Sequence, residues 1–254
     1  MLFEALSQYK PTLPSKEQVQ SYVAAISAKY PFARNVGFAC DGAKFAIQTP
    51  PGDIQQSIFY NGWTRGHYVS CIFVFAPDGT IPICALNAPG CLHDSTVAFY
   101  GDVYKSLEQL YDEFGVKTVV DSAFRIGNGN FLLKSSQTDP QEGPDERGHE
   151  LLLQNRHATS VRQLSEWGMH QIRCKFPRMD DTLKYETRGQ RVLDLSLMIR
   201  LYNHQCQSIG MNQILNTFMA HQSAEVQYFA TGIFVDNNAN YIAESLAGRN
   251  IQEL

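Results

Sequence analysis

Three acidic residues, far apart in the sequence, have the right type and setting to build a metal-dependent site. Asp41 and Asp121 each follow a run of apolar residues, and Glu166 lies in a helix-like stretch. Carboxylates that converge from two strand ends and a helix suit a hard divalent cation such as Mg²⁺, which takes oxygen ligands and keeps part of its water shell. Two such ions, roughly 4 Å apart, activate a water and stabilise the leaving oxygen when a phosphodiester is cleaved. We therefore expect a site of this kind.

Each acid also has a simpler structural explanation. Asp41-Gly42 is a sequence typical of a tight turn, and Asp121 could cap a helix that follows a strand. Glu166 could pair with Arg162, one turn earlier on the same helix. A carboxylate at the carboxyl end of a parallel strand is, however, also where α/β proteins place their active sites. The acids alone leave both interpretations open.

The composition is that of an ordinary globular protein. The chain has 254 residues, 44% of them hydrophobic and 18% charged, which is enough for one large domain or two small ones. The net charge of −4 argues against a dedicated nucleic-acid-binding module, because such modules are usually basic. This net charge is still compatible with a nuclease core whose DNA is bound mainly by another domain. Basic clusters at 173–178 and 184–191 could form a local groove or only a solvated face.

Other chemistries find little support in the sequence. The six cysteines show no Cys-x-x-Cys spacing, which argues against a zinc site. The chain has no P-loop, nucleophile elbow or His-Glu-x-x-His motif, and the glycines at 125–129 do not form a dinucleotide fingerprint. No apolar run reaches the roughly 18 residues of a membrane span, and the first residues do not resemble a signal peptide. We therefore expect an intracellular protein without a membrane partner or an organic cofactor.

The order of the expected elements indicates an α/β fold. The patterns first predict a helix at 15–30 with a capping box at Ser15, and then a strand at 36–47 broken at Asp41-Gly42. A hairpin of 67–75 with 80–86 and one helix over 94–114 follow. The rest of the pattern predicts a buried parallel strand at 116–120, a short strand at 131–134, and helices at about 155–172, 187–206 and 211–222. Residues 135–149 are polar and rich in Pro and Gly, which indicates a loop inside the domain.

This order fits a mixed sheet with helices on both faces. The first strand and the strand that follows the first crossover helix can be neighbours in such a sheet. The acids at their carboxyl ends, Asp41 and Asp121, would then project side by side.

Several short motifs, taken in order, resemble a known family. They are Cys40–Phe45, Phe59–Trp63 with His67–Ser70, Ala88–Ser95, Val120–Phe124, Ser160–Gln163 with Glu166–Met169, and Leu201–Asn203 with Gly210–Ile214. They resemble the Harbinger-type DDE superfamily endonucleases, which are the catalytic domains of transposases, and together they span about residues 36–220. The resemblance implies an RNase H-like fold, here a mixed five-stranded sheet flanked by helices.

The resemblance also implies the site residues and the reaction. Asp41, Asp121 and Glu166 would be the first, second and third catalytic acids and would bind two Mg²⁺ or Mn²⁺ ions, with Asp41 bridging both. Asp94 follows His93 in a motif that the family shares, and it would be either a fourth acid near the metals or only a helix N-cap. The reaction would be hydrolysis of transposon-end DNA, after which the freed 3′-OH attacks target DNA at the same site.

The resemblance divides the chain into a helical lead-in at 1–35, a catalytic domain at 36–222 and a C-terminal tail at 223–254. The family's transposases carry an N-terminal DNA-binding region, for which 35 residues are too few. The chain therefore resembles a fragment, a degenerate copy, or a core that relies on a separate DNA-binding partner protein. The resemblance also implies a homo-oligomer in the nucleus, although the sequence has no K/R-rich import signal. Ala43 stands where the family often has threonine, a change that removes a hydroxyl but no metal ligand.

Two other functions stay open. The chain could be a domesticated, catalytically inactive descendant that binds DNA or protein. It could also be a related hydrolase that cleaves RNA–DNA hybrids.

Overall fold

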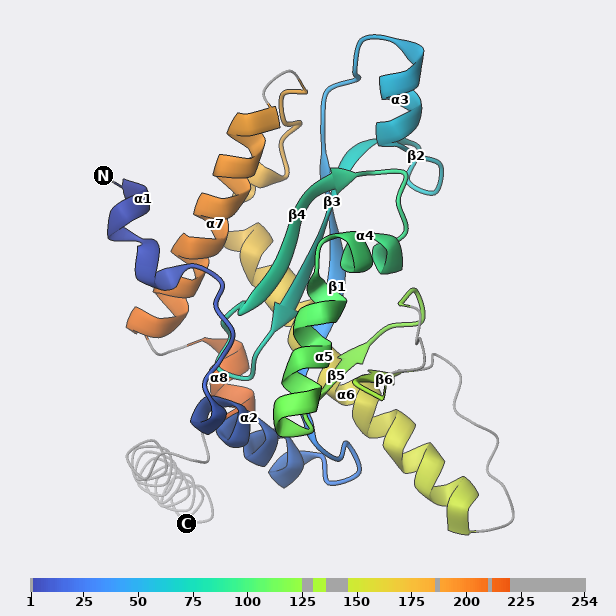
Figure 1. Ribbon diagram of the computed structural model, residues 1–254, viewed down its shortest axis with the longest axis vertical. Coiled ribbons are helices and arrows are strands. Elements are labelled where there is room, and N and C mark those ends of the chain that lie inside the picture. Colours follow the sequence, from blue (N-terminus) through green and yellow to red (C-terminus); the bar gives the residue numbers. More distant parts are fainter. Residues whose placement is uncertain (1, 125–129, 136–145, 186–187, 210–211, 220–254) are drawn as a thin grey trace, which may run out of the picture.

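A mixed sheet forms the centre of the computed structural model (Figure 1), which describes residues 2–124, 130–135, 146–185, 188–209 and 212–219. Its main strands, in spatial order, are β4 (Ile83–Pro89), β3 (Gly66–Phe75), β1 (Val36–Ala46), β5 (Lys117–Val120) and β6 (Leu132–Lys134). β3 is antiparallel to β1 and β4, whereas β5 is parallel to both β1 and β6. A two-residue strand, β2 (Tyr60–Asn61), also pairs with β3. The predicted RNase H-like sheet of five strands is confirmed, with β2 as a short addition.

The central strand β1 continues through Asp41 and Gly42. The predicted break at these residues was wrong, because both keep their partners on β3, Phe73 and Ile72. Successive side chains of a strand point to opposite faces of the sheet. Asp41 therefore faces one layer of helices, and the position of Gly42 faces the other.

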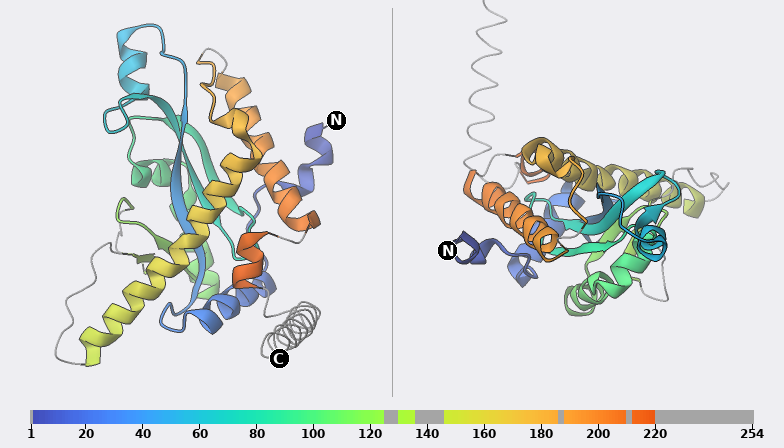
Figure 2. Two further views of the ribbon diagram at one scale, coloured as in Figure 1. Left: turned by 180° about the vertical axis from the view of Figure 1, so that it is seen from behind. Right: turned by 90° about the horizontal axis from the view of Figure 1, so that it is seen from above.

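Helices cover both faces of the sheet. α6 (Glu146–Lys175) crosses one face diagonally, with α7 (Arg188–Ile209) beside it (Figure 2). α4 (Asp94–Tyr100) and α5 (Val103–Phe114) cover the opposite face. Each layer buries its own hydrophobic cluster against the sheet, one around Phe75 and the other around Phe38. A sheet whose apolar surface is covered on both faces explains why its central strands are so rich in β-branched and aromatic residues.

The first long helix, α2 (Lys16–Lys29), closes one end of the sheet (Figure 1). The predicted capping box is confirmed: the Ser15 hydroxyl accepts from the Gln18 N–H, and the Gln18 side chain accepts from the Ser15 N–H. On the buried side of the helix, the Tyr22 hydroxyl donates a hydrogen bond of 2.5 Å to Asp78. α2 is thereby tied to the turn between β3 and β4.

The helix predicted over 94–114 is two helices, α4 and α5. Gly101 ends α4, and Asp102 adopts a left-handed backbone with φ of 57° before α5 begins. A Cβ added to Gly101 would lie 2.4 Å from the Cβ of Ala85 on β4. The chain therefore turns between α4 and α5 where Gly101 contacts β4. The sequence around Gly101 does not reveal this contact. Gly115, with φ of 68°, ends α5 as predicted.

The other predicted elements differ mainly in their ends. The predicted hairpin is β3 with β4, and α6 begins at Glu146, so the last part of the expected loop at 135–149 is helical. Residues 136–145 of that loop and the tail at 223–254 lie outside the described residues. The remaining elements are α1 (Leu2–Ala5), η1 (Ser7–Tyr9), α3 (Asp53–Phe59), η2 (Pro177–Met179) and α8 (Gln213–Phe218).

Candidate active site

Asp41 and Asp121 belong to neighbouring parallel strands at the centre of the sheet, Asp41 within one strand and Asp121 just past the end of the other. Asp121 directly follows β5, whose last residue, Val120, pairs with Cys40 on β1. One carboxylate oxygen of Asp41 accepts from the Gly42 N–H at 2.8 Å, and one of Asp121 accepts from the Ala123 N–H at 2.8 Å. The sheet register therefore brings together two residues that are 80 positions apart in the sequence.

The surroundings of Asp41 disfavour its ionised form. The pKa of Asp41 is raised from 3.8 to about 6, mainly by burial and also by the nearby charges of Asp121 and Asp94. The Gly42 N–H and the positive charge of Arg162 act in the opposite direction on this pKa. Partial burial and neighbouring like charges both favour a proton or a cation at this position.

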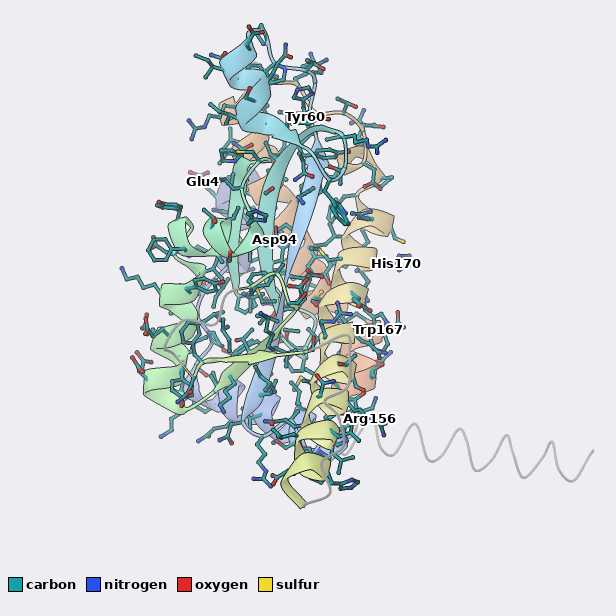
Figure 3. All side chains as sticks on the ribbon, turned by 90° about the vertical axis from the view of Figure 1, so that its right-hand side faces the viewer. Glu4, Tyr60, Asp94, Arg156, Trp167 and His170 are labelled. Carbon is teal, nitrogen blue, oxygen red and sulfur yellow. The ribbon has the colours of Figure 1, made fainter. Side chains whose placement is uncertain are left out.

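Asp94 approaches the same strand from the opposite face of the sheet. It is the first residue of α4, and His93 is the N-cap, so the N-cap interpretation of Asp94 was wrong. A Cβ added to Gly42 would lie 2.6 Å from the carboxylate carbon of Asp94. Burial raises the pKa of Asp94, the charge of Lys44 lowers it, and the charge of Asp121 raises it. Figure 3 shows Asp94 beside the central strands, across the sheet from Trp167 on α6.

Glu166 lies on α6, where it pairs with Arg162. The Arg162 guanidinium is 2.6 Å from a Glu166 carboxylate oxygen, and these side chains are 27% and 45% exposed. The i,i+4 ion pair, which was the structural alternative to a metal-binding role for Glu166, is therefore present. Since the charge of Arg162 also lowers the pKa of Asp41, this arginine interacts with both acids. The charges of Asp41, Asp94 and Asp121, called the acidic cluster below, therefore act on one another across β1, and Arg162 links Glu166 to Asp41.

The donor atoms present suit a hard divalent cation at Asp41 and Asp121. Mg²⁺ keeps several waters and needs only one or two carboxylates from the protein. The backbone hydrogen bonds described above engage one oxygen of each carboxylate and orient the pair. Within the described ranges, however, no group of three His, Cys, Asp or Glu side chains has the spacing to hold a metal ion. Glu166 would have to leave Arg162 to join the two aspartates.

A cavity of about 400 Å³ opens on the α4 side of the acidic cluster, where Asp94 lines it. Its walls include six side chains from four parts of the chain: Lys44, Tyr60, Trp63, His93, Asp94 and Ala123. Ala123 belongs to the turn that begins at Asp121, so the cavity adjoins the segment that carries Asp121.

Sequence reasoning used the segment 59–63 and the basic residues Lys44 and Arg162 only as parts of motifs. It assigned no role in the site to any of them beyond the pairing of Arg162 with Glu166. The alternation of β1 could have placed Lys44 on the same face as Gly42. Nothing local could have shown that Trp63 reaches this cavity.

None of the helices in the described part of the chain has the length and apolar character needed to cross a membrane.

The comparisons with known proteins give one match. Comparison with curated proteins and with solved structures found no match. The sequence does match, over residues 40–203, the family described as DDE superfamily endonuclease. This stretch is more than half of the chain, runs from β1 into α7, and contains Asp41, Asp94, Asp121 and Glu166. The chain therefore belongs to the DDE superfamily endonuclease family.

Proposed function

We propose that the protein is a metal-dependent DNA endonuclease and strand transferase, the catalytic core of a transposase of the Harbinger type. Membership of the family supports a nuclease-like function in general. The finer proposal rests on one observation: the partly buried Asp41 lies on β1, Asp121 directly follows the adjacent parallel strand β5, and the charge of Asp121 raises the pKa of Asp41. Such a pair is suited to holding a cation next to a phosphate.

Asp41 and Asp121 would hold Mg²⁺ or Mn²⁺, two ions in the complete site, with Glu166 as the third ligand and Asp94 as an accessory acid. When bound, the ions supply an activated water and stabilise the charge on the leaving oxygen. The Gly42 and Ala123 N–H groups orient the two aspartates for this task. Arg162 holds Glu166 in place on α6 and offsets part of the negative charge at Asp41 until the cations arrive.

The proposed reaction has two steps at this one site. In the first step, water attacks a phosphodiester of the transposon end, the P–O3′ bond breaks, and a 3′-OH and a 5′-phosphate result. In the second step, that 3′-OH attacks a phosphodiester of target DNA, joins to its phosphorus and releases a new 3′-OH. A separate DNA-binding protein, a homo-oligomeric assembly and a nuclear location belong to the same proposal.

Loss of one aspartate should abolish DNA cleavage. Asp121→Asn keeps the size of the side chain but removes the charge that holds a cation, so Mn²⁺-dependent nicking of supercoiled plasmid should fall at least about 100-fold. Asp112→Asn, which makes the same change at an exposed position of α5, is the matched control and should nick like the parent. Circular dichroism shows whether both variants keep the fold. Equal nicking by Asp121→Asn and the parent would refute the proposal.

A second candidate, an inactive descendant that binds DNA or protein, is favoured by the pairing of Glu166 with Arg162 instead of with the aspartates. It predicts no Mn²⁺-dependent nicking by the parent and no loss of DNA binding in Asp121→Asn. Parallel cleavage assays on duplex DNA and on an RNA–DNA hybrid distinguish the DNA endonuclease and the inactive descendant from a hybrid-specific hydrolase, which would cleave only the hybrid.

A further inference from the structure

Trp63 is held out into solvent beside the acidic cluster. Its side chain is 93% exposed, the largest fraction among the big apolar side chains of the described residues. Single exposed apolar residues are common on protein surfaces. Trp63 differs from such residues because it lines a cavity, and because the segment that carries it is fixed by hydrogen bonds.

Asn61 fixes this segment from both sides. Its side-chain amide donates to the Gly90 carbonyl at 2.9 Å, and its side-chain oxygen accepts from the Thr64 N–H at 3.1 Å and from the Thr64 hydroxyl at 3.0 Å. Gly90 in turn packs so closely that an added Cβ would lie 2.4 Å from the Tyr68 carbonyl oxygen on β3. The cavity wall that carries Trp63 is therefore anchored to the central sheet.

The cavity combines three chemistries that suit a nucleotide. Trp63 and the 44%-exposed Tyr60 supply aromatic surface, and Lys44 supplies a positive charge. Asp94 supplies acceptor oxygens that an exocyclic amino group of a base could reach. A volume of about 400 Å³ lies within the range of small-ligand sites in proteins.

The exposed ring favours an unpaired base over a paired one. The faces of a base inside a duplex are covered by its neighbours, so an aromatic side chain can stack only on a base that is unpaired, terminal or turned out of the helix. Stacking also needs no positive charge, which matters for a chain whose net charge is −4. A local aromatic contact can therefore bind DNA even though the net charge of the chain does not attract it.

We propose that this cavity binds one unpaired nucleotide of the DNA strand being processed, with its base stacked on Trp63 and its backbone drawn toward Lys44. The proposal rests on the proposed DNA endonuclease function and identifies the form of DNA that the site takes. The nucleotide would lie next to the turn at Asp121 and would thereby position the neighbouring phosphodiester at the acidic cluster.

Fluorescence tests the contact directly. The chain has two tryptophans, so the variant Trp167→Phe leaves Trp63 as the only tryptophan emitter. Titration of this variant with a short oligodeoxyadenylate, in EDTA so that cleavage cannot occur, should quench most of the Trp63 emission. A blunt duplex of the same length should quench it far less. No quenching by the single strand, or equal quenching by both forms, would overturn the proposal.

Affinity measurements on the otherwise unchanged chain give a second readout. Trp63→Ala should weaken binding of a duplex with a three-nucleotide single-stranded end on the order of 5- to 100-fold, because stacking on that ring is lost. Trp63→Phe should retain most of the affinity, and binding of blunt duplex should not change. Tyr100→Ala, which removes a 77%-exposed ring on α4 that does not line the cavity, is the matched control.

The outcomes separate this inference from the proposed function. Stacking without any Asp121-dependent nicking would support the nucleotide site and refute the nuclease. Asp121-dependent nicking with unchanged binding by Trp63→Ala would support the nuclease and refute the nucleotide site.

Discussion

At the scale of single residues, Arg162 determines how the acids are arranged. It pairs with Glu166 at 2.6 Å and its charge also stabilises the ionised form of Asp41. A cation that binds at Asp41 must compete with this positive charge, since like charges repel over such short distances. Arg162 is therefore a positioning residue that keeps the metal-free site intact and opposes metal binding at the same time.

Removal of this charge should tighten metal binding. Arg162→Gln frees Glu166 and removes the repulsion of an incoming cation, so Mn²⁺ affinity measured by calorimetry should rise roughly 3- to 10-fold. The control is Arg34→Gln, which breaks another ion pair to α6, with Glu150, at an exposed position. A drop in Mn²⁺ affinity for Arg162→Gln, or an equal change in the control, would show that Arg162 does not compete with the metal.

At the scale of elements, the sequence reveals what depends on local pattern. The apolar runs of β1, β3, β4 and β5 were sufficient to predict these strands, and the order of strands and helices was sufficient to show that β1 and β5 can be neighbours, as they are. The i,i+4 spacing was sufficient to indicate the pairing of Arg162 with Glu166 as an alternative to a metal-binding role for Glu166.

The failures come from contacts between distant segments. The expected break in β1 was wrong because Gly42 is a strand residue that leaves room for the Asp94 carboxylate, and the single helix over 94–114 was wrong because Gly101 touches Ala85. The cavity at Trp63 likewise depends on Asn61 reaching Gly90, 29 residues later. No local pattern contains any of these contacts.

The close approach of α4 to β1 gives a test at this scale. Gly42→Ala places a methyl group 2.6 Å from the Asp94 carboxylate carbon, so the free energy of unfolding should fall by about 1–3 kcal/mol, the usual cost of overpacking. Asp94→Ala should remove most of this cost in the double variant, because it removes the group that clashes.

A double-mutant cycle measured by urea unfolding gives the coupling between the two positions. Additive effects of Gly42→Ala and Asp94→Ala would mean that α4 does not pack on β1 at Gly42. Ala98→Gly, at a buried position further along α4, is a control that alters the helix without removing the contact.

At the scale of the whole molecule, the acids and the cavity are divided between the two faces of the central sheet. Asp41 faces α6 on one side of β1, while Asp94 and the cavity at Trp63 lie on the side of α4. The acids therefore meet at one strand from two layers of the fold. With a net charge of −4, the chain has little general attraction for DNA, which is consistent with the proposal of a catalytic core that depends on local contacts and on a separate DNA-binding protein.

The central claim is that Asp41 and Asp121 form one cation-binding site. The most direct measurement is calorimetric titration of the metal-free protein with Mn²⁺, compared among the parent, Asp121→Asn and the exposed control Asp112→Asn. We expect saturable binding by the parent and the control, and a loss of at least about tenfold in affinity for Asp121→Asn, because one of the two negative carboxylates is gone. Equal Mn²⁺ binding by the parent and Asp121→Asn, or no saturable binding by the parent, would contradict the claim.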